Sequence, residues 1–228
     1  MAHRVVLTQA ADGSDRLAVT LRADGMEVVE CPLIRIEPLE CPPPELSRYD
    51  WLVLTSARAV DLLLRRLPPA AELPAVAVVG PGTAEALRGR GIEPALVART
   101  STQEGLVEDL RRALASLGRA PRVLFAGAEG ARDVLVRELG ADFVPLYRAV
   151  EIRPETFPAA DLVVLASASA ARSLAALAVD LPCVSIGPVT SGEARRSGLR
   201  VVAEAASHDL DGLVKAVRLA ASHLPSRP

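Results

Sequence analysis

The chain has 228 residues, half of them hydrophobic, and a formal net charge of −2. A chain of this length can bury one large core or two small ones, and the balanced charge argues against a nucleic-acid partner, which usually needs clustered positive charge. The three cysteines, Cys31, Cys41 and Cys183, lack metal-ligand spacing, and no apolar run approaches the roughly 20 residues of a membrane helix. We therefore expect a cytoplasmic protein without a membrane or nucleic-acid partner.

Short β-branched runs alternate with amphipathic helical stretches along the first half of the chain. Strands are predicted at residues 4–8, 27–36, 51–56, 75–80 and 93–98, and helices at residues 14–25, 57–67, 82–91 and 102–118. In the last of these helices, apolar residues recur with helical spacing from Leu106 to Leu117. Because strands and helices alternate, the sequence predicts parallel sheets connected by right-handed crossovers.

The second half of the chain repeats the first in order. The turn VVGPGTAEALRGRG around Gly80 recurs as SIGPVTSGEARRSG around Gly187, 107 positions later, and Gly105 recurs as Gly212 at the same spacing. WLVLTSARAVDLL resembles LVVLASASAARSL, and the start of the chain recurs more loosely from residue 122. We interpret these matches as an internal duplication of about 110 residues, which gives two similar α/β lobes.

Two long extended segments interrupt the alternation at the same place in each repeat. They span about residues 31–44 and 144–158, and both are flanked by prolines, which bias their neighbours toward extended backbone and cannot continue a helix. Two ordinary surface loops would show the same composition. The duplication favours a paired connector between the lobes.

Turns rich in glycine and hydroxyl residues follow the predicted strands in both halves. Helix starts offer free N–H groups and a partial positive charge, and the carboxyl ends of parallel strands form the usual binding edge of such a sheet. Plain N-capping is the alternative for any one turn. Six such turns, five of them at 55–56, 80–83, 101–102, 167–169 and 187–190 and the sixth at Ser207, favour a shared anionic ligand. The residues expected to bind it are Thr55, Ser56, Gly82, Thr83, Ser101, Ser167, Ser169, Gly187 and Thr190.

Motifs for nucleotides, metals and hydrolytic triads are absent from the sequence. There is no GxGxxG or P-loop, no cluster with metal spacing, and the three histidines are isolated, so we expect no cofactor and no metal. Tyr147, in PLYRAV on the second connector, stands out. A tyrosine is a weak acid that can protonate a leaving oxygen, although a half-buried strand tyrosine is the simpler reading.

The sequence resembles the uroporphyrinogen-III synthase family over essentially its whole length. The matching segments are LTSARAV, AVVGPGTAEALRGRGI, EGLVEDL, RVLFAGAEGARDVL, PLYRAVEI, VLASASAARSL, SIGPVTSGEARRSG and DLDGLVKAV, in that order. The resemblance implies two α/β lobes joined by a two-stranded β-ladder, with the active cleft between them. It places residues 1–37 and 152–228 in lobe one and residues 38–151 in lobe two.

The resemblance also implies a reaction and its substrate. Family members cyclise the linear tetrapyrrole hydroxymethylbilane to uroporphyrinogen III, with loss of water and inversion of ring D, in tetrapyrrole biosynthesis and without a cofactor. Tyr147 aligns with a family tyrosine near the departing hydroxyl and is the expected catalytic residue. Thr55, Ser56, Arg58 and Thr83 would contact substrate carboxylates from lobe two, and Ser167, Ser169 and Thr190 from lobe one. Arg132 is either a carboxylate partner or a helix-surface charge.

Three departures from the family pattern leave other functions open. Gln9 stands after the first strand where relatives often have arginine, Val189 replaces a threonine, and Ala166 replaces Thr or Ser. The alternatives are a two-lobed intracellular binding protein and an inactive synthase homologue that binds an anionic ligand. For an active enzyme we expect a monomer that receives its substrate by hand-over from hydroxymethylbilane synthase.

Overall fold

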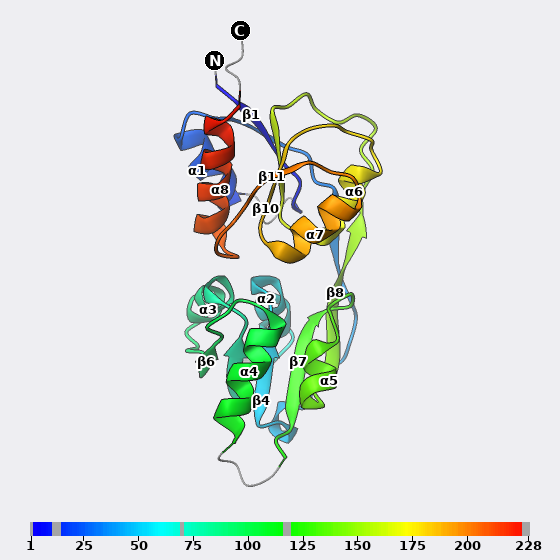
Figure 1. The fold of residues 1–228 in the computed structure, drawn as a ribbon. Coiled ribbons are helices and arrows are strands. Elements are labelled where there is room, and N and C mark those ends of the chain that lie inside the picture. The colour runs from blue at the N-terminus through cyan, green and yellow to red at the C-terminus, as the bar shows by residue number, and fades with distance from the viewer. Residues whose placement is uncertain (1, 11–14, 69–70, 116–119, 225–228) are drawn as a thin grey trace. The chain divides into compact units, whose positions relative to one another are not determined.

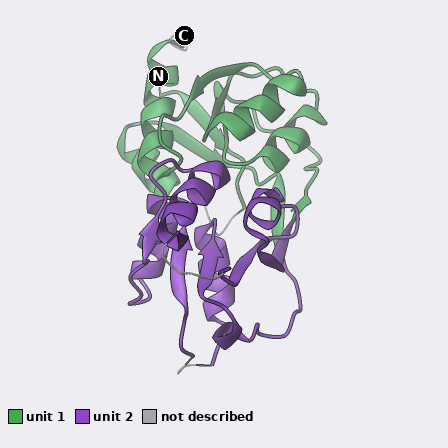
Figure 2. Ribbon diagram, turned by 60° about the horizontal axis from the view of Figure 1, so that its bottom comes forward, with its two compact units in different colours: residues 1–36, 149–228 green, residues 37–148 purple. Residues whose placement is uncertain are grey.

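The structure is a computed structural model that describes residues 2–10, 15–68, 71–115 and 120–224. The chain divides into two compact units, shown in Figure 2. Unit 1 comprises Met1–Ile36 and Ala149–Pro228, and unit 2 comprises Glu37–Arg148; the sequence-based boundaries fall after residues 37 and 151. The first residue of the helix predicted at 14–25 and the last three residues of the helix predicted at 102–118 lie outside the described residues.

Unit 1 contains a parallel sheet with the strand order β11-β10-β9-β1-β2. Figure 1 labels three of these strands, β1, β10 and β11, together with the helices of the unit. Its strands are β1 (Arg4–Leu7), β2 (Glu27–Glu30), β9 (Leu162–Leu165), β10 (Cys183–Ser185) and β11 (Val201–Glu204). Its helices are α1 (Asp15–Ala23), α6 (Ala168–Ala175), α7 (Pro188–Arg196) and α8 (Leu210–Ser222).

Helices cover both faces of this sheet. Along β9, Leu162 and Val164 pack in one core cluster with α1 and α8, whereas Val163 and Leu165 pack in another with α6 and α7. Successive strand residues point to opposite faces, so a strand between two helix layers must be apolar throughout. This requirement explains why the predicted strands read as continuous hydrophobic runs.

The second sheet has the strand order β3-β8-β7-β4-β5-β6. Its strands are β3 (Ile34–Pro38), β4 (Trp51–Leu54), β5 (Ala75–Val78), β6 (Leu96–Val97), β7 (Val123–Ala128) and β8 (Asp142–Glu151). Unit 2 also contains the 3₁₀ turn η2 (Leu46–Arg48) and the helices α2 (Ala57–Leu64), α3 (Pro81–Arg88), α4 (Gln103–Leu114) and α5 (Val134–Leu139). α2 and α3 pack on one face of the sheet, and α4 and α5 pack on the other.

The chain passes from one unit to the other in β3 and returns in β8, and these two strands are neighbours. The Leu39 N–H donates to the Leu146 carbonyl, and the Ile152 N–H donates to the Leu33 carbonyl, both at 2.9 Å. The partner numbers rise along one strand as they fall along the other, so the strands are antiparallel. The predicted two-stranded ladder is confirmed.

One predicted strand consists of two strands in the structure. The run at 27–36 is divided into β2, in the sheet of unit 1, and β3, in the other sheet. The break contains Pro32, which has no N–H to donate to a ladder. The chain therefore leaves one sheet and enters the other within this run, at the start of the connector predicted at 31–44.

The two sheets share one arrangement. β4, β5 and β6 have the same relative order as β9, β10 and β11, and β7 and β8 continue the sheet on the side where β1 and β2 do in unit 1. This correspondence fits the duplication, which stays our interpretation. No helix within the described ranges is long and apolar enough to cross a membrane.

Candidate functional site

The carboxyl edge of the unit 2 sheet consists of strand-to-helix turns. After β4, Ser56 is the N-cap of α2, and its Oγ accepts a hydrogen bond from the Ala59 N–H at 3.1 Å. After β6, Thr102 caps α4 in the same way, accepting from the Gly105 N–H at 3.0 Å. The N-capping interpretation is therefore correct for Ser56. A hydroxyl that accepts one such bond still has its own proton to donate, so capping and ligand binding are compatible.

The carboxyl edge of the unit 1 sheet has the same construction. Ser167 caps α6 and accepts from the Ala170 N–H at 3.1 Å. Asp209 caps α8 and accepts from the Gly212 N–H at 2.8 Å. Each unit thus presents capped helix starts at one edge of a parallel sheet, where N–H groups and the helix dipole favour anions.

Gly80 and Gly187 precede α3 and α7 and have nearly identical extended backbones, with φ of 176° and 167°. Their neighbours approach closely. A Cβ on Gly80 would lie 2.6 Å from the Ser101 Oγ, and one on Gly187 would lie 2.5 Å from the His208 ring. The structure therefore places the predicted residue Ser101 directly against the Gly80 turn.

Tyr147 lies on β8, and its hydroxyl is 3.0 Å from the Ser56 Oγ, with either atom able to donate. The ring is half-buried and packs against the core on the α2 and α3 side of the sheet. Two residues that were predicted separately from the sequence are thus in direct contact: Tyr147, the expected proton donor, and Ser56, the N-cap of α2. This contact places the Tyr147 hydroxyl at the N-terminus of α2, although the residue itself is on β8.

Other predicted residues differ in how far they are exposed. The side chains of Thr83 and Thr190, in the first turns of α3 and α7, are buried, with 6% and 4% of the residue exposed. Gly82 is exposed with open space around it. Thr55, Arg58 and Ser169 are half-buried. A ligand at these turns would therefore meet backbone at Gly82 more readily than the Thr83 hydroxyl.

Arg132 already forms an ion pair. Its guanidinium donates two hydrogen bonds, at 2.5 and 3.1 Å, to the two carboxylate oxygens of Glu104 in the first turn of α4. The Arg132 hydrogen bond lowers the pKa of Glu104 below its usual value. Because its charge is balanced, Arg132 is a weaker candidate for a substrate carboxylate than the sequence suggested.

Sequence reasoning missed several residues of these edges. The sequence pointed to the Ser101-Thr102 turn, and Thr102 is the cap of α4. In the corresponding turn of unit 1 the sequence pointed to Ser207, whereas the cap of α8 is Asp209. A signal was present, because Thr102 and Asp209 lie 107 positions apart and each is followed by a glycine three residues later. Arg66, which contacts β8 beside Tyr147, had no such signal.

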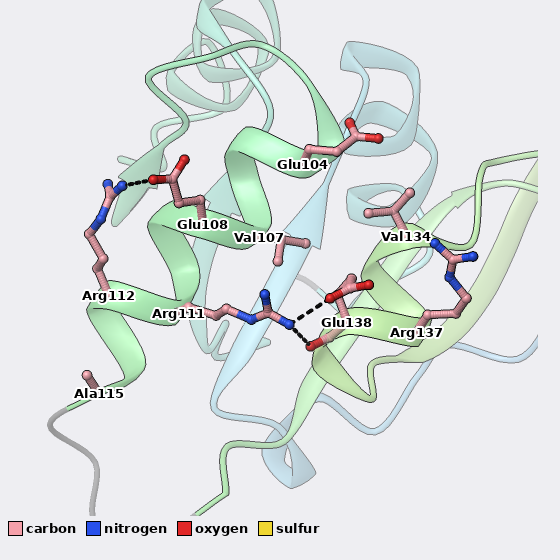
Figure 3. A pocket seen from close by; sticks show the side chains of 9 residues that line it. All are labelled: Glu104, Val107, Glu108, Arg111, Arg112, Ala115, Val134, Arg137 and Glu138. Carbon is pink, nitrogen blue, oxygen red and sulfur yellow. Dashed lines mark hydrogen bonds and ion pairs between the residues drawn. The ribbon is translucent and has the colours of Figure 1, made fainter.

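A groove of about 600 Å³ lies between α4 and α5 (Figure 3). No predicted site residue lines it. In the figure Arg111 reaches Glu138, at 2.7 Å, and Arg112 reaches Glu108. The groove is lined by Glu104, Val107, Glu108, Arg111, Arg112, Ala115, Val134, Arg137 and Glu138. These pairs satisfy charges of both signs within the groove, which gives no indication of an anion site. Over the described part of the chain, no three His, Cys, Asp or Glu side chains gather in a way that could hold a metal.

Comparisons with known proteins agree on one family. The family model of uroporphyrinogen-III synthase HemD matches residues 15–215. The uroporphyrinogen-III synthase of Synechococcus elongatus is 30% identical over 250 aligned positions, which cover 93% of each chain.

Two solved structures share the fold. The uroporphyrinogen-III synthetase of Helicobacter pylori has a TM-score of 0.64 at 16% identity, over 96% of this chain and 99% of that one. A mutant uroporphyrinogen III synthase of Thermus thermophilus has a TM-score of 0.60 at 17% identity, over 97% and 99%. The family model covers most of the chain, and the turns at both sheet edges are those on which the resemblance rested. The chain belongs to the uroporphyrinogen-III synthase family.

Proposed function

We propose that Tyr147 is the proton donor in the family reaction and that the turns at the two sheet edges hold the substrate carboxylates. The reaction itself, cyclisation of hydroxymethylbilane to uroporphyrinogen III by a cyclising lyase, follows from family membership. The observation that supports the proposal is the contact between the Tyr147 hydroxyl and Ser56 Oγ at the start of α2.

The hydrogen bonds around Ser56 determine which partner accepts the phenolic proton of Tyr147. The Ser56 Oγ accepts from the Ala59 N–H, so its own proton is free to be donated to the Tyr147 oxygen. The phenolic proton is then available to a third group, since a phenol both accepts and donates. A departing hydroxyl of the substrate is the group that needs it. In this arrangement the phenolate that forms on proton transfer is stabilised by the serine and by the positive end of the helix.

Substrate positioning is the larger part of the task. Loss of the hydroxyl is assisted by the electron-rich pyrrole, and the free chain closes without inverting its last ring. The enzyme must hold the chain so that the substituted carbon of ring D is attacked, which is catalysis by orientation. Eight acetate and propionate groups suit the anion-favouring helix starts of both sheets. We assign them to the turns that contain Thr55, Ser56, Arg58, Gly82, Thr83 and Ser101 in unit 2, and Ser167, Ser169, Gly187 and Thr190 in unit 1. At the buried Thr83 and Thr190 the contact would be made by backbone N–H groups.

A coupled assay tests the activity. Porphobilinogen and its deaminase generate hydroxymethylbilane, this protein is added, and the oxidised uroporphyrin isomers are separated. We expect isomer III in excess over a control that lacks the protein. Isomer I alone, together with saturable binding of the tetrapyrrole, would support the inactive-homologue alternative.

Substitution of Gly82 by alanine tests whether substrate approaches the start of α3. A Cβ there meets no atom within 4 Å, and alanine has a higher helix propensity than glycine. We therefore expect an unchanged or higher melting temperature. We also expect about a tenfold higher KM, because the methyl group stands where a carboxylate meets the helix N–H groups. Steady-state kinetics of Gly82→Ala and Gly192→Ala, a helical glycine with similar open space, measure the difference. An equal KM for the two variants would remove Gly82 from the site.

We further propose that the chain acts as a cytoplasmic monomer and takes its substrate by hand-over from hydroxymethylbilane synthase. Hydroxymethylbilane closes spontaneously to the wrong isomer in water. A short transfer from the enzyme that makes it would therefore limit that loss.

A further inference from the structure

Arg66 follows α2 and connects this part of the chain to β8, the strand that carries Tyr147. Its Nη2 donates to the carbonyl oxygens of Leu39, at 2.6 Å, and Leu146, at 2.9 Å. Its Nη1 donates to the Cys41 Sγ at 2.8 Å. One guanidinium thus bonds to β8 and to the segment that follows β3. The carbonyl that it reaches on β8 belongs to the residue before Tyr147.

The pairing of β8 with β7 is irregular at this point. Gly127 is opposite Pro145, but the next residue, Ala128, is opposite Tyr147. Leu146 is therefore an extra residue on β8, which makes this a β-bulge. Bulges redirect the side chains that follow them.

The bulge decides which face of the sheet receives Tyr147. Val144 lies opposite Ala126 and packs on the α2 and α3 side. In a regular ladder Leu146 would also point to that side and Tyr147 to the α4 and α5 side, because successive residues alternate. With the extra residue, both Leu146 and Tyr147 pack on the α2 and α3 side. Only there can the phenol meet Ser56.

Hydrogen bonds hold the bulge in place. The Leu146 carbonyl accepts from both the Leu39 N–H and Arg66, which uses its two lone pairs. The Tyr147 carbonyl accepts from the Glu129 N–H at 2.7 Å. Of these bonds, the one from Arg66 is charge-assisted, the stronger class of hydrogen bond.

We propose that Arg66 is a positioning residue for Tyr147: it holds the bulge at Leu146, which brings the phenol to Ser56. The inference rests on the proposed catalytic role of Tyr147. It assigns Arg66 no contact with substrate. Its effect on the reaction is expected only through the tyrosine.

Arg66 can be replaced without leaving a cavity in the hydrophobic core. The side chain is half-buried and lines, with residues 38–42, a surface hollow of about 650 Å³. Arg66→Met keeps the apolar stem and removes the donors. Arg66→Lys keeps a charge but cannot form the same fork. The neighbouring Arg65, an exposed residue paired with Asp61 at 2.9 Å, offers Arg65→Met as the matched control.

The test compares steady-state formation of uroporphyrinogen III by these variants alone and combined with Tyr147→Phe. We expect Arg66→Met to lower kcat about tenfold with KM little changed, as displacement of one catalytic group by a fraction of an ångström does. Arg66→Lys should recover part of the loss, and Arg65→Met should match the parent. In the Tyr147→Phe background, Arg66→Met should have no further effect, because the group it positions is gone. Circular dichroism and thermal melting confirm that each variant is folded.

The outcomes separate this inference from the proposed role of Tyr147. If Tyr147→Phe leaves kcat unchanged, the catalytic role itself is wrong and the inference falls with it. If Tyr147→Phe lowers kcat and Arg66→Met does not, Tyr147 stays catalytic and the positioning role is overturned. An equal loss from Arg66→Met in both backgrounds would also overturn it, because Arg66 would then act independently of the tyrosine.

Discussion

Replacing Tyr147 by phenylalanine is expected to lower kcat for uroporphyrinogen III formation by about a hundredfold, the lower end of the usual contribution of a general acid. The change removes the hydroxyl and keeps the ring, which packs against the α2 and α3 core. The fold should therefore persist. With the enzyme slowed, more hydroxymethylbilane closes spontaneously, so the fraction of isomer I should rise at a fixed enzyme concentration.

Tyr49→Phe is the matched control, because the chain has only two tyrosines. The Tyr49 hydroxyl donates to the Asp142 carboxylate, at the start of β8, at 2.9 Å. Isomer separation and initial rates for both variants give the comparison. Equal rates for Tyr147→Phe and the parent would reduce Tyr147 to a packing residue, and Ser56 to a plain helix cap.

Local chemistry explains which parts of the site could be predicted. Ser56 and Ser167 begin helices because a serine at an N-cap accepts from the N–H three residues later, and this signal lies within four residues of sequence. The same holds for the Gly-Pro turns at Gly80 and Gly187, where proline is pre-organised for the first helical position. Parallel connectivity then brings all of these turns to one edge of each sheet.

Tertiary contacts explain what could not be predicted. Ser56 and Tyr147 are 91 positions apart, and Arg66 and Leu146 are 80 apart. The bulge at Leu146 leaves no mark in the pattern PLYRAV, since a regular strand would read the same. Arg132 was predicted near carboxylates, and it is near one, but the carboxylate belongs to Glu104 of the same unit. The sequence thus identified Arg132 as a residue that binds a carboxylate, but not Glu104 as the residue that supplies it.

Gly212→Ala is expected to destabilise unit 1 by about 1–3 kcal/mol, the usual cost of adding a methyl group to a packed site. Gly212 is buried in the first turn of α8, and a Cβ there would collide with the Ser207 carbonyl oxygen. The obstacle is backbone, so relief requires movement of the whole 207–212 turn. Gly105 stands in the same relation to Thr100, whose carbonyl would lie 2.5 Å from a Cβ, and Gly105→Ala should destabilise unit 2.

Urea unfolding can assign each loss to its unit, because the single tryptophan, Trp51, lies in unit 2. Gly105→Ala should lower the midpoint followed by Trp51 fluorescence. Gly212→Ala should lower the midpoint followed by circular dichroism, to which both units contribute, and leave the Trp51 fluorescence midpoint unchanged. Gly192→Ala is the control of opposite sign: its Cβ would meet open space in α7, so the better helix propensity should raise stability by about 0.5–1 kcal/mol. If Gly212→Ala behaved like Gly192→Ala, the turn before α8 would be looser than the structure shows. The glycines repeated 107 positions apart would then need an explanation other than close packing of each helix start on its preceding turn.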